Sequence, residues 1–180
     1  MSYLFASDLH GSAYYAEKVI EKFEASGAEK LILLGDILYH GPRNDLPKGH
    51  DPKKVFALLN RYADRIIAVR GNCDAEIDQM VLDFPLTADY SHMMIEGKEF
   101  FLTHGHIYSP ENMPRLPEGA VFVFGHIHLP VAEKKEGVTI LNPGSASLPK
   151  EGNPNSYALH DGGVFTIRTF DDDVIKSIEV

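Results

Sequence analysis

The sequence predicts an α+β fold, a four-layer α/β/β/α sandwich in which two mixed β-sheets pack face to face with helices outside. In the first half, apolar runs of strand length alternate with amphipathic stretches in a βαβαβ order. Past Met80 the pattern changes to short β runs separated by turn residues. At 180 residues and without a linker or internal repeat, the chain is expected to form one domain, residues 1–180.

Three strands and two helices are expected in the first half. The strands are Tyr3–Ala6, Lys30–Leu34 and Arg65–Val69. Ser12 is a suitable N-cap for the first helix, and Gly27 is expected to end it. Asp51 followed by Pro52 is typical of the start of a second helix, because proline is favoured at the first helical position.

The second half is expected to contain mainly strands, since its apolar residues alternate or form short runs. These are Ser91–Ile95, Lys98–Thr103, Ala120–Phe124, Gly137–Leu141, Ser156–Leu159, Val164–Phe170 and Val174–Ile178. The segment 142–145, Asn-Pro-Gly-Ser, follows one of them and predicts a structural turn.

Composition excludes several classes of function. The net charge is -9 and no basic run exceeds two residues, which argues against binding to long nucleic acids. No apolar run approaches the ~20 residues of a membrane span, and no secretion signal is visible. The single cysteine cannot form an internal disulfide and fits a cytoplasmic location.

The strongest functional signal is a set of polar side chains at the ends of five successive strands. They occur in the segments Asp8-Leu9-His10, Gly35-Asp36, Gly71-Asn72, His104-Gly105-His106 and Gly125-His126-Ile127-His128. Each segment alone is a weak signal, because such residues are common in turns. All five together, each after an apolar run, predict a metal site at one edge of the sheets.

The mixture of carboxylate, amide and imidazole groups indicates the kind of metal. A structural zinc site would favour several thiolates, and only one cysteine is present. The observed donors suit Mn, Fe, Co, Ni or Zn in an open site, with Mg as a further alternative. Seven ligands are too many for one catalytic ion but suit two ions that share a carboxylate.

This ordered set resembles the calcineurin-like metallophosphoesterase superfamily, whose motifs are D-x-H, G-D, G-N-H-[DE], H and G-H-x-H. The resemblance covers nearly the whole chain and implies the metallo-dependent phosphatase fold. Within the superfamily, the short length and the segment 40–44, His-Gly-Pro-Arg-Asn, are similar to the bacterial YfcE-type phosphodiesterases.

The resemblance implies a ligand set for each of two divalent ions, most simply Mn. One ion would be held by Asp8, His10, Asp36 and His128, and the other by Asp36, Asn72, His104 and His126. Asp36 would bridge the ions, and a water activated by both would attack the phosphorus atom.

The chain departs from the family motif at Cys73, where the family has a histidine that acts as a general acid or orients the phosphate. A thiol, with a reference pKa of about 8.5, is a poor proton donor at neutral pH. Cys73 and its acidic neighbour Asp74 stay catalytic candidates, and so does His106, which lies two residues after His104. The departure favours a slow enzyme or one that needs good leaving groups.

Three further residues are candidates for contact with the substrate: His40, Arg43 and Arg70. The remaining histidines, His50, His92 and His160, have no motif around them and are expected to face solvent.

The resulting prediction is a metal-dependent phosphodiesterase, a phosphoric diester hydrolase, that acts on a small phosphodiester. A phosphomonoesterase at the same site is the nearest alternative, although the missing histidine favours diesters. A non-catalytic protein-interaction scaffold is the alternative from another class, since the superfamily includes such a case. The resemblance also suggests a homodimer or a higher homo-oligomer.

Overall fold

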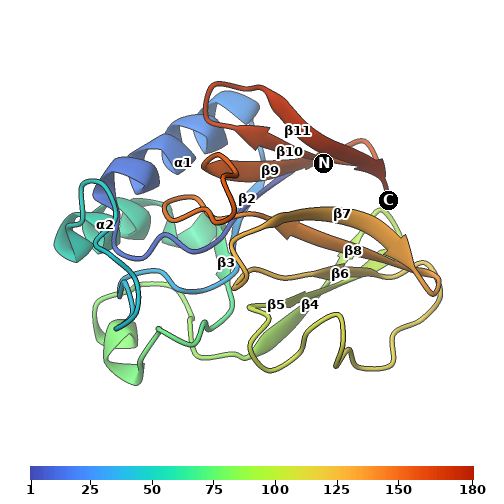
Figure 1. Cartoon of the computed structure of the whole chain (residues 1–180), viewed down its shortest axis with the longest axis horizontal. Coiled ribbons are helices and arrows are strands. Elements are labelled where there is room, and N and C mark those ends of the chain that lie inside the picture. The colour runs from blue at the N-terminus through green and yellow to red at the C-terminus, as the bar shows by residue number, and fades with distance from the viewer.

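Two mixed β-sheets pack face to face in the computed structural model, which describes all 180 residues (Figure 1). In spatial order the first sheet contains β11 (Val174–Glu179), β10 (Val164–Thr169), β9 (Ser156–Asp161), β1 (Tyr3–Ala6), β2 (Lys30–Leu33) and β3 (Ile66–Ala68). The second contains β4 (Tyr90–Ile95), β5 (Lys98–Thr103), β6 (Val121–Val123), β8 (Val138–Pro143) and β7 (Pro130–Lys135). The predicted fold class is confirmed.

Both helices begin where the sequence predicts, and α1 also ends there. In α1 (Ala13–Ser26) the Ser12 side chain accepts a hydrogen bond from the Tyr15 amide at 3.2 Å, and Gly27 ends the helix in the left-handed conformation. In α2 (Pro52–Leu59) the Asp51 side chain accepts from the Lys54 amide at 3.2 Å. Two 3₁₀ segments, η1 (Asn60–Arg65) and η2 (Glu76–Met80), complete the helical elements.

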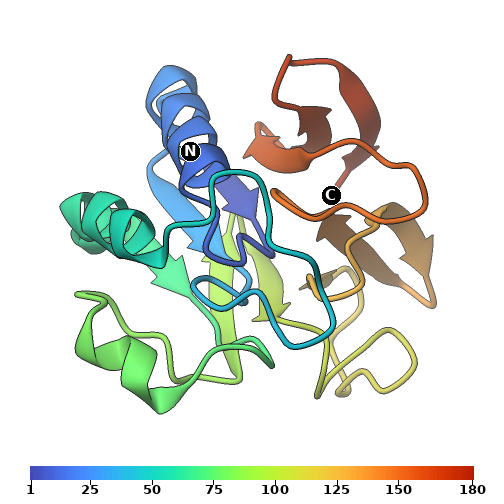
Figure 2. The same cartoon turned by 60° about the vertical axis from the view of Figure 1, so that its left-hand side comes forward.

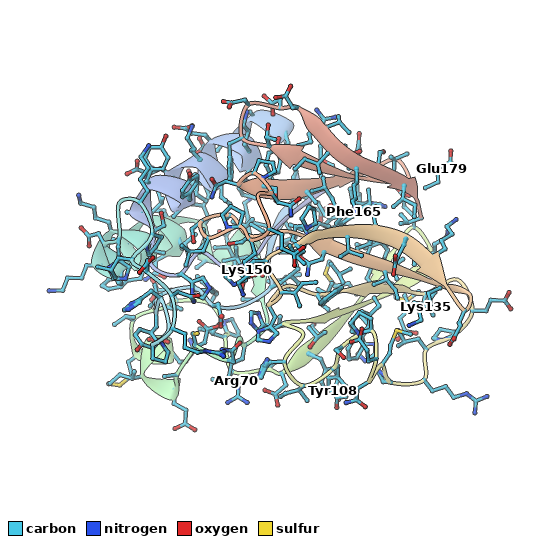
Figure 3. All side chains as sticks on the ribbon, viewed as in Figure 1. Arg70, Tyr108, Lys135, Lys150, Phe165 and Glu179 are labelled. Carbon is cyan, nitrogen blue, oxygen red and sulfur yellow. The ribbon has the colours of Figure 1, made fainter.

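The core has two main layers because neighbouring residues of a strand face opposite sides of the sheet. On β1, Leu4 packs in the cluster that also contains the apolar faces of α1 and α2. Phe5 packs instead between the two sheets, together with Phe100 and Phe165 (Figure 3). Since this second cluster joins both sheets, we propose that residues 1–180 form one domain.

A loop covers the outer face of the second sheet, whereas helices cover the outer face of the first sheet. A cluster on that face, which contains Phe101, Phe122 and Ile140, packs against Tyr108 and Leu116. Both of these lie in the segment 104–119, which forms no helix. β7 was not predicted, because its residues, Pro-Val-Ala-Glu-Lys-Lys, are largely polar at its exposed end.

Each sheet contains three neighbouring parallel strands, and this arrangement positions the site. They are β1, β2 and β3 in the first sheet and β5, β6 and β8 in the second. The carboxyl ends of parallel strands meet at one edge, where ligands commonly bind. Figure 2 shows the loops of the first sheet and the loop after β8 meeting at the front of the molecule. None of the helices is long and apolar enough to cross a membrane.

Candidate metal centre

Most of the predicted ligands form one buried cluster at this edge. The donor atoms of Asp8, His10 and His128 lie within 4.8 Å of one another, and those of Asp8, Asp36 and His104 do as well. All five residues are at most 3% exposed. The sequence separates Asp8 from His128 by 120 residues, so the two sheets bring together groups that no local pattern could connect.

The backbone at these positions is strained in a way that points to function. The left-handed conformation, which non-glycine residues rarely adopt, occurs at Asp8, His10, Asp36, His126 and His128, with φ between 48° and 67°. Each such residue costs about 1–3 kcal/mol unless the surrounding structure imposes it. Five of them among the predicted ligands indicate that the fold has been shaped to aim these side chains inward.

Three histidines are oriented by hydrogen bonds from their Nδ1 atoms to main-chain carbonyl groups. His10 contacts the Tyr39 oxygen at 2.9 Å, and His104 contacts the Leu34 oxygen at 2.6 Å. His128 contacts the Leu148 oxygen at 2.5 Å. Since a carbonyl only accepts, each Nδ1 carries a proton, and each ring turns its Nε2 atom toward the cluster. Histidines that ligate metal ions are usually held in this way.

The inward-facing atoms crowd one another, which is the test of whether the site fits a cation. The Nε2 atoms of His10 and His128 lie 3.3 Å apart, and His128 Nε2 is 3.2 Å from Asp8 Oδ1. That carboxylate oxygen is buried and has no hydrogen-bond partner. An unpaired buried oxygen beside facing lone pairs is costly, and a divalent ion would satisfy all of them. The residues therefore fit a metal.

The two carboxylates and the histidines shift the pKa values of one another. Burial acts to raise the pKa of Asp8, but His128 and the neighbouring histidines outweigh it and hold the pKa below its usual range. Burial acts to lower the pKa of His104, yet Asp36 and Asp8 raise it to about 9. The cluster thus holds its carboxylates ionised although it is buried, as a cation site requires.

Asp36 lies between two groups of donors. Its Oδ2 atom is 3.7 Å from His10 Nε2 and 3.4 Å from His104 Nε2. The same His104 Nε2 atom is 3.1 Å from Asn72 Oδ1. The His126 ring lies 5.1 Å from the His104 ring and lines the cavity above the cluster. The seven predicted ligands are thus together, and Asp36 is central.

Asp74 holds the loops that carry the ligands. Its carboxylate accepts from the amides of Asp36 and Ile37, both at 2.8 Å, and of Gly71 at 2.7 Å. An amide left unsatisfied in a buried site costs about 1–3 kcal/mol, so these bonds fix one loop against the other. Asp74 does not line the cavity, and the geometry gives it a positioning role where the sequence suggested catalysis.

Cys73 lines the cavity, and its thiol lies close to His10 and Asp36. Its main-chain amide donates to Asp36 Oδ1 at 2.8 Å. Burial and the neighbouring carboxylates raise the pKa of the thiol to about 12. It is therefore neutral at physiological pH, a weak proton donor and a weak nucleophile. His106 stacks at the flank of the site, with its ring 5.4 Å from that of His104.

The predicted substrate contacts divide into three cases. Arg43 lines the cavity, which has a volume of about 310 Å³. Arg70 does not, because its guanidinium is paired with Asp89, with Nε 2.9 Å from the carboxylate (Figure 3). His40 lines a neighbouring, more apolar cavity. The prediction that Arg70 faces the substrate is therefore not supported by the geometry.

The prediction of three solvent-facing histidines is right for one of them. The His92 side chain is 50% exposed. His160 is 1% exposed and packs against the rings of Tyr3 and Phe100, so that prediction is wrong. β9 is covered on both faces, and a strand of this kind gives no alternating pattern that would reveal an inward-facing histidine. His50 is half-buried and lines the cavity of His40.

Two features of the site were not predicted from the sequence. Lys150 lines the cavity from the loop after β8, and an isolated exposed lysine carries no motif (Figure 3). Ser145 and Ser147 donate to the Asp8 carbonyl at 3.0 and 2.8 Å, which supports its left-handed conformation. The segment 142–145 was predicted to be a turn, but Asn142 and Pro143 belong to β8, and only Gly144 and Ser145 follow the strand. Its position after a strand was the one available sequence signal for this support.

Comparison with known proteins gives the family. Residues 1–162 match the calcineurin-like phosphoesterase superfamily domain. The chain belongs to this superfamily. It is 51% identical to phosphodiesterase YfcE of Escherichia coli K12 over 175 residues. This alignment covers 97% of this chain and 95% of that protein. A further superfamily relative is phosphodiesterase MJ0936 of Methanocaldococcus jannaschii, which is 30% identical over 146 residues, 77% of this chain and 80% of that one.

The same superfamily fold is present in a solved structure. The E. coli phosphoesterase Yfce aligns with a TM-score of 0.98 and 49% sequence identity, covering 99% of both chains. The family implies divalent metal ions, and the donor cluster is the candidate site for them.

Proposed function

We propose that this protein hydrolyses a small phosphodiester with a water molecule activated by two divalent metal ions. Its class, phosphoric diester hydrolase, rests on the superfamily domain and on 51% identity to a phosphodiesterase. The single observation that carries the two-ion proposal is the position of Asp36, whose Oδ2 atom faces His10 on one side and His104 on the other.

Each proposed ion has its own donors, and the two share Asp36. The first set is Asp8, His10, Asp36 and His128, and the second is Asp36, Asn72, His104 and His126. When bound, such ions supply Lewis acidity to a phosphoryl group and a nucleophilic water at neutral pH. Nitrogen and oxygen donors in this mixture are compatible with Mn, which we propose first, and with Ni, Co, Zn, Fe or Mg.

The other residues of the site bind and orient the substrate. Arg43 and Lys150 line the cavity and would hold the phosphate oxygens not engaged by the metal. Asp74 keeps Asp36 and Gly71 in place through its three main-chain hydrogen bonds. The neutral Cys73 thiol can lie next to the leaving group but is a poor proton donor to it.

This pattern favours diesters with good leaving groups. A monoester dianion needs more positive charge and a proton donor for its alkoxide, and the cavity has no histidine in the family position of Cys73. Arg43 and Lys150 do provide two cations, so a phosphomonoesterase stays the second candidate. A non-catalytic scaffold is less well supported, because every ligand position of the family motif is filled.

The test is hydrolysis of bis-p-nitrophenyl phosphate and of p-nitrophenyl phosphate by metal-stripped protein, before and after addition of Mn, Mg, Ni or Zn. We expect metal-dependent cleavage of the diester, and a loss of at least about a thousandfold in Asp36→Asn. Asp83→Asn, at an exposed aspartate outside the cavity, is the matched control.

Two other results would change the proposal. Faster cleavage of the monoester would favour the phosphomonoesterase. Absence of turnover with every metal, in protein shown to bind two ions, would favour the scaffold. The homo-oligomer, the cytoplasmic location and the exclusion of long nucleic acid stay predictions.

A further inference from the structure

The cavity above the metal centre contains two cations that have no anionic partner in the chain. Arg43 and Lys150 line it, and Asp36, a proposed metal ligand, is the only carboxylate in the lining. Two acidic residues nearby in the sequence, Asp45 and Glu151, do not line the cavity. Neither cation forms an ion pair within 4.0 Å. Although the net charge of the protein is -9, this cavity therefore offers two free positive charges to a ligand.

The main chain of Lys150 is fixed at the metal centre (Figure 3). Its amide donates to the His128 carbonyl at 3.3 Å, and its own carbonyl accepts from the amide and the side chain of Asn153 at 3.0 and 2.9 Å. Two residues earlier, the Leu148 carbonyl accepts from His128 Nδ1. The loop is thus bonded twice to His128, a proposed metal ligand. Only the side chain of Lys150 has to be ordered when it binds an anion, which limits the entropic cost.

Arg43 lies on a different loop, the one after β2, which packs against Cys73. A Cβ on Gly41, two residues before Arg43, would lie 3.0 Å from the Cys73 sulfur. Cys73 occupies the position of the family histidine that acts as a general acid, so this loop lies near the leaving group. Lys150 comes from the loop after β8 and is free to contact another part of the substrate.

A simple phosphodiester does not need both cations. In the proposed mechanism, the carboxylates of Asp8 and Asp36, an ionised water and the single charge of a diester already balance two divalent ions. The charges of Arg43 and Lys150 are then in excess, and one of them suffices to contact the unesterified oxygens of the reacting phosphate. Excess positive charge in a cavity attracts a further anion.

We propose that Lys150 binds a second anionic group, a carboxylate or a phosphate, carried by the ester group that stays on the phosphorus atom after hydrolysis. The inference rests on the proposed phosphodiesterase function and names its substrate class. An ammonium group binds either anion through charge-assisted hydrogen bonds. The cavity volume of about 310 Å³ leaves room for a short anionic chain beside the reacting phosphate.

The test compares p-nitrophenyl diesters that release the same leaving group and differ in the retained chain. Carboxypropyl p-nitrophenyl phosphate carries the second anion, and carbamoylpropyl p-nitrophenyl phosphate is a neutral ester of matched size. For the metal-loaded wild type at low ionic strength, we expect kcat/KM to be at least about tenfold higher for the carboxypropyl ester. Without an anion site that ester should be no better than the neutral one, since the protein has a net charge of -9. Phosphonopropyl p-nitrophenyl phosphate then shows which of the two anions is preferred.

Variants assign the preference to one cation. Lys150→Met removes the charge and keeps most of the apolar stem, so the preference for the carboxypropyl ester should fall at least about fivefold. Lys53→Met is the matched control, because Lys53 is exposed and lies outside the cavity, and its loss changes the net charge equally. Arg43→Gln should lower kcat/KM for both esters alike. Its matched control is Arg115→Gln, at an exposed arginine outside the cavity.

The outcomes separate this inference from the proposed function. Equal kcat/KM for the charged and neutral esters, or a preference that Lys150→Met leaves unchanged, overturns the inference. If no ester is cleaved with any metal, the proposed function fails, and calorimetry with the expected products decides the inference by itself. Carboxypropyl phosphate that binds more tightly than carbamoylpropyl phosphate, with a difference lost in Lys150→Met, supports it. Equal binding of the two products overturns it.

Discussion

Two buried histidines at different places in the sandwich behave in opposite ways. His104, at the carboxyl end of β5, is 0% exposed, and Asp36 and Asp8 raise its pKa to about 9 against the effect of burial. His160, between the sheets on β9, is 1% exposed, and there burial lowers the pKa. The same residue type at the same depth is thus surrounded by carboxylates in one place and by aromatic rings in the other.

The difference shows what the strand ends contribute. Around His104 the main chain is bent into left-handed conformations, and polar atoms face one another without partners. Around His160 the strands β9 and β10 pair in regular register over six residue pairs. Five of the nine non-glycine residues with positive φ therefore lie at the edge where the ligands meet. The His160 Nδ1 atom is also buried without a partner, but it lies on a regular strand pair where the main chain is not strained.

Among the tests of this comparison, the largest effect is expected from crowding the strained edge. A Cβ on Gly71 would lie 2.1 Å from Asp36 Oδ1 and 2.4 Å from the Asp36 amide nitrogen. Gly71→Ala should therefore displace Asp36 and lower kcat/KM for the diester about a hundredfold, measured by steady-state kinetics. Gly97→Ala is the control in the hairpin before β5, where φ is +81° and a Cβ would meet nothing within 4 Å, so it adds backbone strain away from the site without crowding it. Equal activity of the two variants would show that the edge tolerates rearrangement.

A smaller effect is expected at Cys73, the residue at this edge that departs from the family motif. Cys73→His restores a group that can donate a proton near neutral pH, so it should speed cleavage of a diester with a poor leaving group. We expect an increase of about tenfold for an alkyl phenyl phosphate and little change for p-nitrophenyl esters. Unchanged rates on every ester would show that proton donation does not limit this site.

The smallest effect is expected from a substitution at His160, in the core between the two sheets. Because the folded pKa of His160 lies below that of the unfolded chain, about 6.5, the unfolded chain takes up a proton first as the pH falls. The stability from neutral His160 is fully present above that value and is lost as the pH falls toward the folded pKa. His160→Phe should therefore raise Tm by about 2–4 °C more at pH 5 than at pH 8. An equal shift at both pH values would contradict this account.

The ligand edge could be predicted from the sequence because each ligand follows its own strand. The residues after Ala6, Leu33 and Thr103 reach the same edge whatever the details of packing, since the strands that carry them are parallel or lie in facing sheets. The helix caps at Ser12 and Asp51 are equally local. Such features depend on neighbours within a few residues, or on strand direction alone.

The features that sequence could not predict depend on contacts between distant segments. Arg70 is held by Asp89, 19 residues away, and only the folded loop brings them together. His160 is buried because both faces of its strand are covered. His40 lies in the loop after β2 and was predicted to contact the substrate, but its side chain lines the neighbouring, more apolar cavity. In each case tertiary packing decided which of several neighbours a polar side chain would meet.

The most direct test of the central claim counts metal ions. The measurement is the number of Mn ions retained per chain after equilibrium dialysis, by elemental analysis, for the wild type and for Asp36→Asn. Because Asp36 Oδ2 faces both groups of donors, the wild type should hold about two ions per chain and the variant fewer than one. A wild type that saturates with one ion, or a variant that retains two, would contradict the shared-carboxylate site.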